Sequence, residues 1–148
     1  MGLMAGSASL DQDAAAKSGP SAMVAALIGW MPRADEAKTA DWHWAFWCVR
    51  DTFKDRLGEL GGLHFHQRPG LPPISDELQD IMQSMAMWGL MAHTREGTAV
   101  DAASQARLQE LTVESIAGRE AVVKKAAREL QHQLDLSEVE MEVEPAWA

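Results

Sequence analysis

The chain has 148 residues, 47% of them apolar and 24% charged, the balance of one globular domain with its own core. Its formal net charge of −9 repels phosphate backbones and attracts basic proteins, so nucleic acid is a disfavoured partner. The lone cysteine, Cys48, excludes an internal disulfide, and the lack of any apolar run near ~20 residues predicts a cytoplasmic protein without a membrane anchor.

The N-terminal part of the chain divides into an arm and a first helix. Residues 1–20 are rich in Ala, Ser and Gly without periodicity, which predicts a flexible arm before a domain over residues 21–134. Ser21 is the expected N-cap of a helix that runs to Met31. Its expected core residues, at helical spacing, are Val24, Leu27, Ile28 and Met31. Residues 33–38 read as a polar link.

The strongest expected helix has Thr39 as its N-cap and continues to about Leu60. One narrow face carries its core residues at spacings of three and four: Trp42, Phe46, Val49, Phe53, Leu57 and Leu60. In the first half, Trp44, Trp47 and Cys48 project away from that face, so this half is apolar all round. Two interpretations stay open: a helix buried on both sides, or a binding surface, because tryptophan is enriched at interface hot spots.

A short strand and a second strong helix are expected next. Residues 63–68 alternate like a half-buried strand, and the prolines within residues 69–73 force a loop. Ser75 is the expected N-cap of a helix that ends at Trp88, with Gly89 where a left-handed C-cap requires glycine. The core face of this helix is expected to consist of Leu78, Ile81, Met82 and Met85.

The last third of the chain has weaker patterns. Residues 90–92 are expected to form a strand, and residues 95–97 a turn or wing tip. Residues 98–106 fit more than one structure, and residues 107–111 are read as a returning strand in preference to the end of a helix. From Thr112 a final helix is expected. Its expected core residues are Ile116, Val123, Ala127, Leu130 and Leu134.

The order of these elements predicts a mainly α fold with a small β-hairpin, a single winged helix-turn-helix-like domain. It is followed by an acidic tail over residues 135–148, which we expect to be frayed from Ser137.

One stretch of the chain, residues 65–91, resembles the Panacea domain of SocA-like antitoxins; it reads FHQRPGLPPISDELQDIMQSMAMWGLM. In that family an aromatic strand is followed by a Gly-Pro turn, a Ser-capped helix with Glu-Leu, and a closing Gly-Leu-Ile. The positions that match are Ser75, Glu77, Leu78, Gly89 and Leu90. The chain departs from the pattern in its proline-rich turn from Pro69 and in residues 41–44, which replace the family's Leu-Gln-Lys-Leu. The resemblance implies a compact domain that neutralises or delivers a protein partner and has no enzyme activity.

The helix over residues 75–88 would be the recognition helix of a winged domain, yet it contains no Lys or Arg. A DNA reader needs basic contacts to phosphate and to guanine. The sequence therefore predicts a non-enzymatic protein–protein interaction domain, antitoxin-like or an adaptor, that engages a basic protein partner. The candidate partner-binding residues are Trp44, Trp47, Asp76, Asp80, Gln83 and Met87.

Two alternatives remain. The first is a winged-helix transcriptional regulator that binds DNA as a homodimer and takes its positive charge from arms or wing. The one tight basic cluster, Lys124, Lys125 and Arg128, is equally typical of a solvated helix face. The second is an accessory subunit of a larger complex that uses its tryptophan face as the seam.

The sequence shows no pattern of a catalytic or metal site. His64 and His66 share one strand face, but with His43 or Cys48 nearby they supply only part of a tetrahedral site. Cys48 and His43 lie five positions apart on one helix, a poor spacing for a nucleophile and its base. We therefore expect no catalytic residue, metal or cofactor, and a buried, inert thiol at Cys48.

Overall fold

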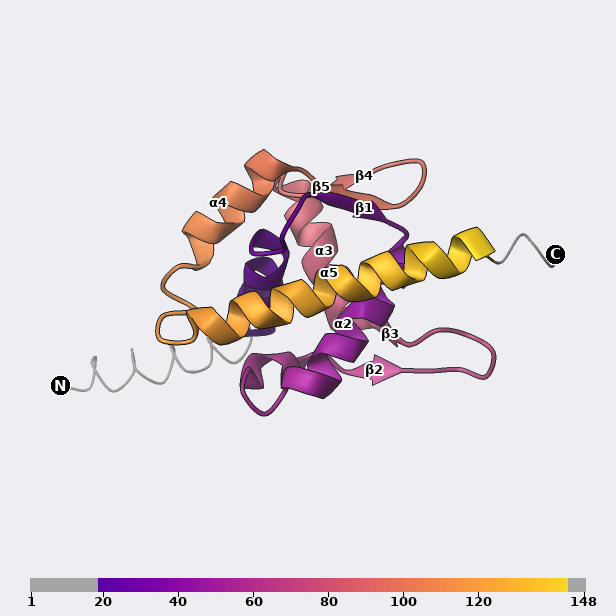
Figure 1. Ribbon diagram of the computed structural model, residues 1–148, viewed down its shortest axis with the longest axis horizontal. Coiled ribbons are helices and arrows are strands. Elements are labelled where there is room, and N and C mark those ends of the chain that lie inside the picture. Colours follow the sequence, from indigo (N-terminus) through magenta and orange to yellow (C-terminus); the bar gives the residue numbers. More distant parts are fainter. Residues whose placement is uncertain (1–18, 144–148) are drawn as a thin grey trace.

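The computed structural model describes residues 19–143, and the side chains of residues 19–137. The expected mainly α architecture with small antiparallel sheets is confirmed. The elements follow in order as a first helix over residues 19–29, β1 (Asp35–Ala37), α2 (Thr39–Phe53), the 3-10 helix η1 (Gly58–Gly62), β2 (Phe65–His66), β3 (Ile74–Ser75), α3 (Asp76–Met87), β4 (Ala92–His93), β5 (Thr98–Val100), α4 (Ala102–Thr112) and α5 (Glu120–Val143) (Figure 1).

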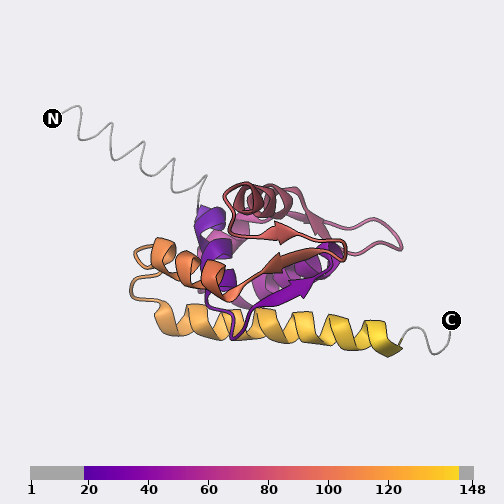
Figure 2. The same cartoon turned by 90° about the horizontal axis from the view of Figure 1, so that it is seen from above.

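Two small antiparallel sheets join segments that are distant in the sequence. One has the strand order β1-β5-β4, with Asp35 opposite Val100 and Ala92 opposite Ala99. The other pairs β2 with β3, with Phe65 opposite Ser75. Figure 2 shows α5 running along the β1 side of the three-stranded sheet. The expected polar link over residues 33–38 is thus wrong in part, because β1 lies within it.

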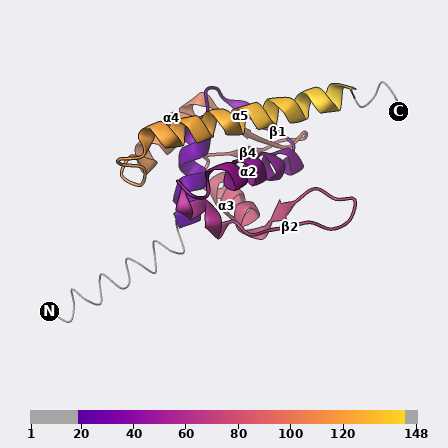
Figure 3. The same ribbon diagram turned by 60° about the horizontal axis from the view of Figure 1, so that its bottom comes forward.

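The core is built around α2, which lies between α5 and α3 (Figure 3). The six residues of its predicted core face are all buried, as expected. Trp42 is fully buried, and its indole Nε1–H donates to the carbonyl oxygen of Thr98 at 3.0 Å. This bond ties α2 to β5 and satisfies the one polar atom of the ring.

The first helix packs closely against α4. A Cβ added to Gly29 would lie 2.9 Å from the Cβ of Leu108, so only glycine allows this approach. The Gln105 amide donates to the carbonyl oxygens of Ile28 at 3.2 Å and Arg33 at 3.1 Å. The Gln109 amide donates to that of Gly29 at 2.7 Å. Two glutamines of α4 therefore satisfy carbonyls at and beyond the C-terminus of the first helix.

Several expected helix boundaries are wrong. Ser21 lies inside the first helix, which ends at residue 29 instead of Met31. The N-cap of α2 is Lys38 rather than Thr39, and α2 ends at Phe53 rather than Leu60. Leu57 and Leu60 nevertheless stay buried, because the chain continues the apolar face through a turn and η1. Arg119 holds η1 in place through a two-pronged ion pair with Glu59, with N–O distances of 2.7 and 2.6 Å.

The region from β4 onward was predicted least well. Residues 107–111 belong to α4, so the expected returning strand is wrong. Thr112 ends α4 instead of starting the final helix, and α5 begins at Glu120. The core residues expected for the final helix are all buried. The expected strand over residues 90–92 is displaced to β4, and the real returning strand is β5.

The turn expected over residues 95–97 is confirmed between β4 and β5, and its glycine is required by contact. A Cβ on Gly97 would lie 2.1 Å from the carbonyl oxygen of Ala37, at the end of β1. The Gly97 N–H also donates to Thr94 Oγ1 at 3.1 Å, which closes the turn. Any larger residue would push the β4-β5 turn away from β1.

The expected limits of the domain both fall inside helices. Residues 19 and 20 belong to the first helix, and α5 continues through the expected start of the tail at residue 135 to Val143. The expected arm over residues 1–18 and the last five residues of the tail lie outside the described residues. Within the described part of the chain, no helix has both the length and the apolar character needed to cross a bilayer.

Candidate functional site

The N-terminus of α3 is anchored by Ser75, the cap that the sequence predicts, and by His43, a residue whose role there the sequence does not predict. Ser75 Oγ accepts the N–H of Leu78 at 3.2 Å, so the predicted N-cap is confirmed. The N–H of Ser75 donates to Nδ1 of His43, on α2, at 3.0 Å. The other ring nitrogen, Nε2, donates to Gln79 Oε1 at 3.2 Å. His43 is 1% exposed, and burial lowers the pKa of its ring. It is thus a neutral structural link between α2 and α3.

The outer face of α3 is acidic and exposed. Asp76, Asp80 and Gln83 are exposed at spacings of four and three, and Met87 is 80% exposed four residues further on. Both carboxylates face solvent, with Asp76 Oδ1 3.6 Å from Nε2 of His66. The structure thus brings four of the six candidate partner-binding residues onto one surface, hereafter the α3 outer face.

The C-terminus of α3 ends in an exposed aromatic side chain. Gly89 has φ +77°, the left-handed conformation that the sequence predicts there, and the N–H of Leu90 donates to the carbonyl oxygen of Met85 at 2.8 Å. This turn leaves Trp88 78% exposed. An exposed tryptophan beside an exposed methionine is the kind of apolar pair that interfaces use.

Trp88 borders a groove of about 300 Å³ between the first helix, α3 and α4. We call it the apolar groove, since every residue that lines it in the described part of the chain is uncharged. Its lining includes Ala22, Ala25, Ile81, Ser84, Leu108 and Leu111. Leu111 is half exposed, which leaves apolar surface open to a ligand. The α3 outer face and this groove therefore meet at Trp88.

The remaining two candidates, Trp44 and Trp47, lie on α2, away from the α3 outer face. Their ring centroids are 5.2 Å apart at an interplanar angle of 46°. Trp44 is 38% exposed and Trp47 is half-buried, in contrast to the fully buried Trp42. The rings are neither fully core nor fully open, so this half of α2 is not buried on all sides, and its use as a binding surface stays a prediction.

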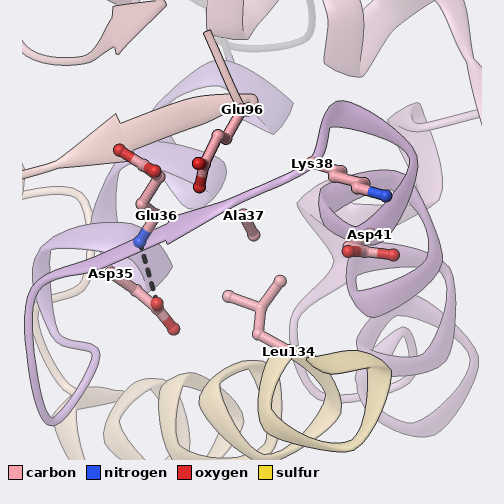
Figure 4. Close-up of a pocket in the computed structure, with 7 residues that line it drawn as sticks. All are labelled: Asp35, Glu36, Ala37, Lys38, Asp41, Glu96 and Leu134. Atoms are coloured by element: carbon pink, nitrogen blue, oxygen red, sulfur yellow. Dashed lines mark hydrogen bonds between the residues drawn. The ribbon is translucent and has the colours of Figure 1, made fainter. Parts of the chain in front are cut away.

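A second hollow, of about 140 Å³, opens between β1, the start of α2, the β4-β5 turn and α5 (Figure 4). Carboxylates dominate its lining, which comprises Asp35, Glu36, Ala37, Lys38, Asp41, Glu96 and Leu134. Asp35 has a structural role, because it accepts the N–H of Glu36 at 2.8 Å and the amide of Gln131 at 2.6 Å. The hollow adds to the negative field of the molecule.

The histidines and the cysteine do not assemble into a reactive site. Glu77 Oε1 lies 3.5 Å from His64 Nδ1 and also accepts the N–H of that residue at 2.7 Å. Burial, together with nearby Glu129 and Asp51, raises the pKa of Cys48, which disfavours the thiolate that a nucleophile requires. Within residues 19–137 no group of three or more His, Cys, Asp or Glu side chains is arranged to hold a metal ion.

The sequence did not single out Trp88 or the apolar groove. Trp88 lies seven residues after Ile81, a spacing that suggests the core face, but its C-cap conformation turns it outward. The glycine that follows is the one local signal of that turn.

Comparison with family models, with curated proteins and with solved structures finds no match to this chain.

Proposed function

We propose that the chain is a non-enzymatic protein-interaction domain of winged-helix type, and that it binds a basic protein partner through the α3 outer face. The element order supports the winged-helix part: a helix, β1, two helices and a β4-β5 hairpin, with the strand order β1-β5-β4. The β2-β3 hairpin is an insertion between the two middle helices. The resemblance of residues 65–91 to the Panacea domain adds the suggestion of an antitoxin-like or adaptor role in the cytoplasm.

One observation carries the proposal. In a winged helix, the helix in the position of α3 enters the DNA major groove, where phosphates surround it. Here that helix presents Asp76 and Asp80, contains no Lys or Arg, and ends in exposed Met87 and Trp88. Carboxylates against phosphates are repulsive, whereas carboxylates on the same helix as an exposed tryptophan suit a protein surface that carries Lys or Arg.

The test compares two charge reversals with the same change in net charge. Asp80→Lys alters the α3 outer face, and Asp51→Lys alters an exposed position on α2. Tagged chains are purified from native cells, and the dissociation constant for the retained protein is measured. We expect a basic partner. Asp80→Lys should weaken its binding by about tenfold, and Asp51→Lys should leave the affinity unchanged. Equal effects of both variants would contradict binding by this face.

A measurement of DNA binding completes the test. Duplex DNA is titrated into the chain at about 50 and 200 mM salt, between which true phosphate contacts weaken binding steeply. Tight binding with that salt dependence, lost in Lys124→Glu/Lys125→Glu, would establish the regulator instead.

A second candidate function, accessory subunit of a complex, is favoured by the partly exposed Trp44 and Trp47 pair. Its test is the mass of native assemblies by light scattering for wild type and for Trp44→Ala/Trp47→Ala. Loss of assembly in the variant alone would assign the seam to this pair, and unchanged assembly would return both rings to a packing role.

A further inference from the structure

We propose that the apolar groove is the docking site for an amphipathic helix of the partner, with aliphatic anchors on one face and basic residues beside them. This inference rests on the proposed function and names the part of the partner that the site would take. It concerns the groove rather than the α3 outer face, so the two can fail separately.

The shape of the groove suits a helix. Its walls come from three helices, and small side chains at Ala22, Ala25 and Ser84 allow another backbone to approach closely. Leu111, which is half exposed, supplies apolar contact area from α4, whereas Leu108 is buried. A volume of about 300 Å³ is at the small end of ligand sites and accepts a few aliphatic side chains rather than a large cofactor. Aliphatic residues spaced i and i+4 on a helix project on one side and would enter together.

The charges on the helices that form the groove favour a partner helix with basic residues beside its apolar face. The first helix has no charged residue over positions 19–29, and α3 contributes Asp80 without any cation. On α4, Glu110 is exposed, and Arg107 lies 3.4 Å from it and is partly neutralised by it; Glu114, also exposed, follows two residues after the end of α4. An apolar helix with flanking Lys or Arg is therefore complementary both to the groove and to its border.

Other occupants fit this border less well. A second copy would bring one acidic α3 outer face and one chain of net charge −9 against another. The side chains of residues 1–18 of the same chain, Asp11 and Asp13 against Lys17, also have no net positive charge. Charge therefore favours a partner helix over either of these.

The experiment selects ligands from a displayed library of random peptides of about 20 residues, long enough to form a helix on binding. The full chain is the target. We expect the enriched peptides to carry aliphatic residues at i and i+4, to have a net positive charge, and to become helical when bound, as measured by circular dichroism. Their affinities are then measured by fluorescence anisotropy with two variants. Ser84→Arg places a large charged side chain in the groove at an exposed position, and Ala121→Arg makes a similar change on the exposed side of α5.

We expect Ser84→Arg to weaken binding of the selected peptides by about tenfold or more. Ala121→Arg should leave their affinity close to that for the wild-type chain. If basic peptides are lost with Asp80→Lys but not with Ser84→Arg, the groove proposal is overturned while the proposed function stands. If the selected peptides carry no positive charge, the basic partner of the proposed function is overturned as well. A dimer that Ser84→Arg dissociates would assign the groove to a second copy of the chain and overturn the proposal. If a chain without residues 1–18 binds the peptides about tenfold more tightly, the groove belongs to residues 1–18, and the proposal is overturned as well.

Discussion

The two ends of α3 differ in almost every physical respect, although the helix is only 12 residues long. At the N-terminus, Ser75 is completely buried and both its N–H and its Oγ are hydrogen-bonded. At the C-terminus, Met87 and Trp88 are exposed and stand beside a groove. Buried polar groups must find partners within the fold, whereas an exposed apolar pair gains stability only when something else covers it. The comparison separates the end of α3 that holds the fold together from the end that is available for binding.

The largest stability effect is expected from His43→Ala, which attacks the anchored end. The change leaves the Ser75 N–H and the Gln79 side chain without their partner and opens a cavity, at a cost of about 2–4 kcal/mol in the free energy of unfolding. Urea unfolding measures it. The exposed His132 on α5 provides the control, because His132→Ala should change stability by less than about 0.5 kcal/mol. Similar small losses in both variants would mean that His43 anchors nothing.

The protonation of His43 should reduce stability in acid. Burial is the main cause that lowers the pKa of its ring below the ordinary value of 6.5, so the unfolded chain takes up this proton before the folded chain does. Stability contributed by the neutral ring is therefore complete above about pH 6.5 and falls as the pH drops toward the lowered pKa, by at most ~1.4 kcal/mol per pH unit for one proton.

Urea midpoints between about pH 8 and pH 5 test this, in a range above the titration of Glu59, whose pKa is lowered mainly by its hydrogen bond with Arg119. His43→Gln should flatten the profile in this window. A profile that keeps its slope in that variant would place the titrating group elsewhere.

A smaller loss is expected when the cap itself is removed. Ser75→Ala deletes the oxygen that accepts the Leu78 N–H and should cost about 1 kcal/mol. Ser84→Ala is the matched change at an exposed position of the same helix, and alanine's better helix propensity should leave it neutral or slightly stabilising. Thermal unfolding followed by circular dichroism distinguishes the two. If Ser75→Ala melts with wild type, the cap bond adds nothing to stability.

The smallest stability effect and the largest binding effect should coincide at Trp88. Because this ring is 78% exposed, Trp88→Ala should alter the free energy of unfolding by less than about 0.5 kcal/mol. Loss of an interface tryptophan should nevertheless weaken binding of the partner by about tenfold or more. Calorimetric unfolding and partner titration on the same preparation measure both. A stability loss above about 2 kcal/mol would show that the ring packs in the core, as Trp42 does.

Features that depend on neighbours in the chain were predictable. The cap at Ser75 and the left-handed Gly89 are local, because each satisfies backbone groups within one helical turn. The buried face of α2 was equally visible, since large apolar residues repeat there at helical spacing. By contrast, the part of α4 over residues 107–111 was expected to be a strand, because the buried face of this helix, Gln105, Leu108 and Thr112, contains a single large apolar residue.

The candidate site was only half predictable for the same reason. Four residues of the α3 outer face follow from the helical period once the core face is known. The apolar groove does not, because Ala22, Ser84 and Leu111 come from three helices and meet only when the chain is folded. Likewise, nothing near His43 in the sequence points to Ser75, 32 residues away, as the donor to its ring.

The sequence by itself determined the helical class, the acidic charge, the caps of α3 and the core faces of the two strongest helices. Hydrogen bonding within a turn and the periodic burial of side chains are properties of short segments. Only the tertiary structure decided that His43 is a buried link, that α4 is a helix and that Trp88 borders a groove. Each of these depends on which distant segments pack together, and that choice is made by burial and hydrogen-bond satisfaction over the whole chain.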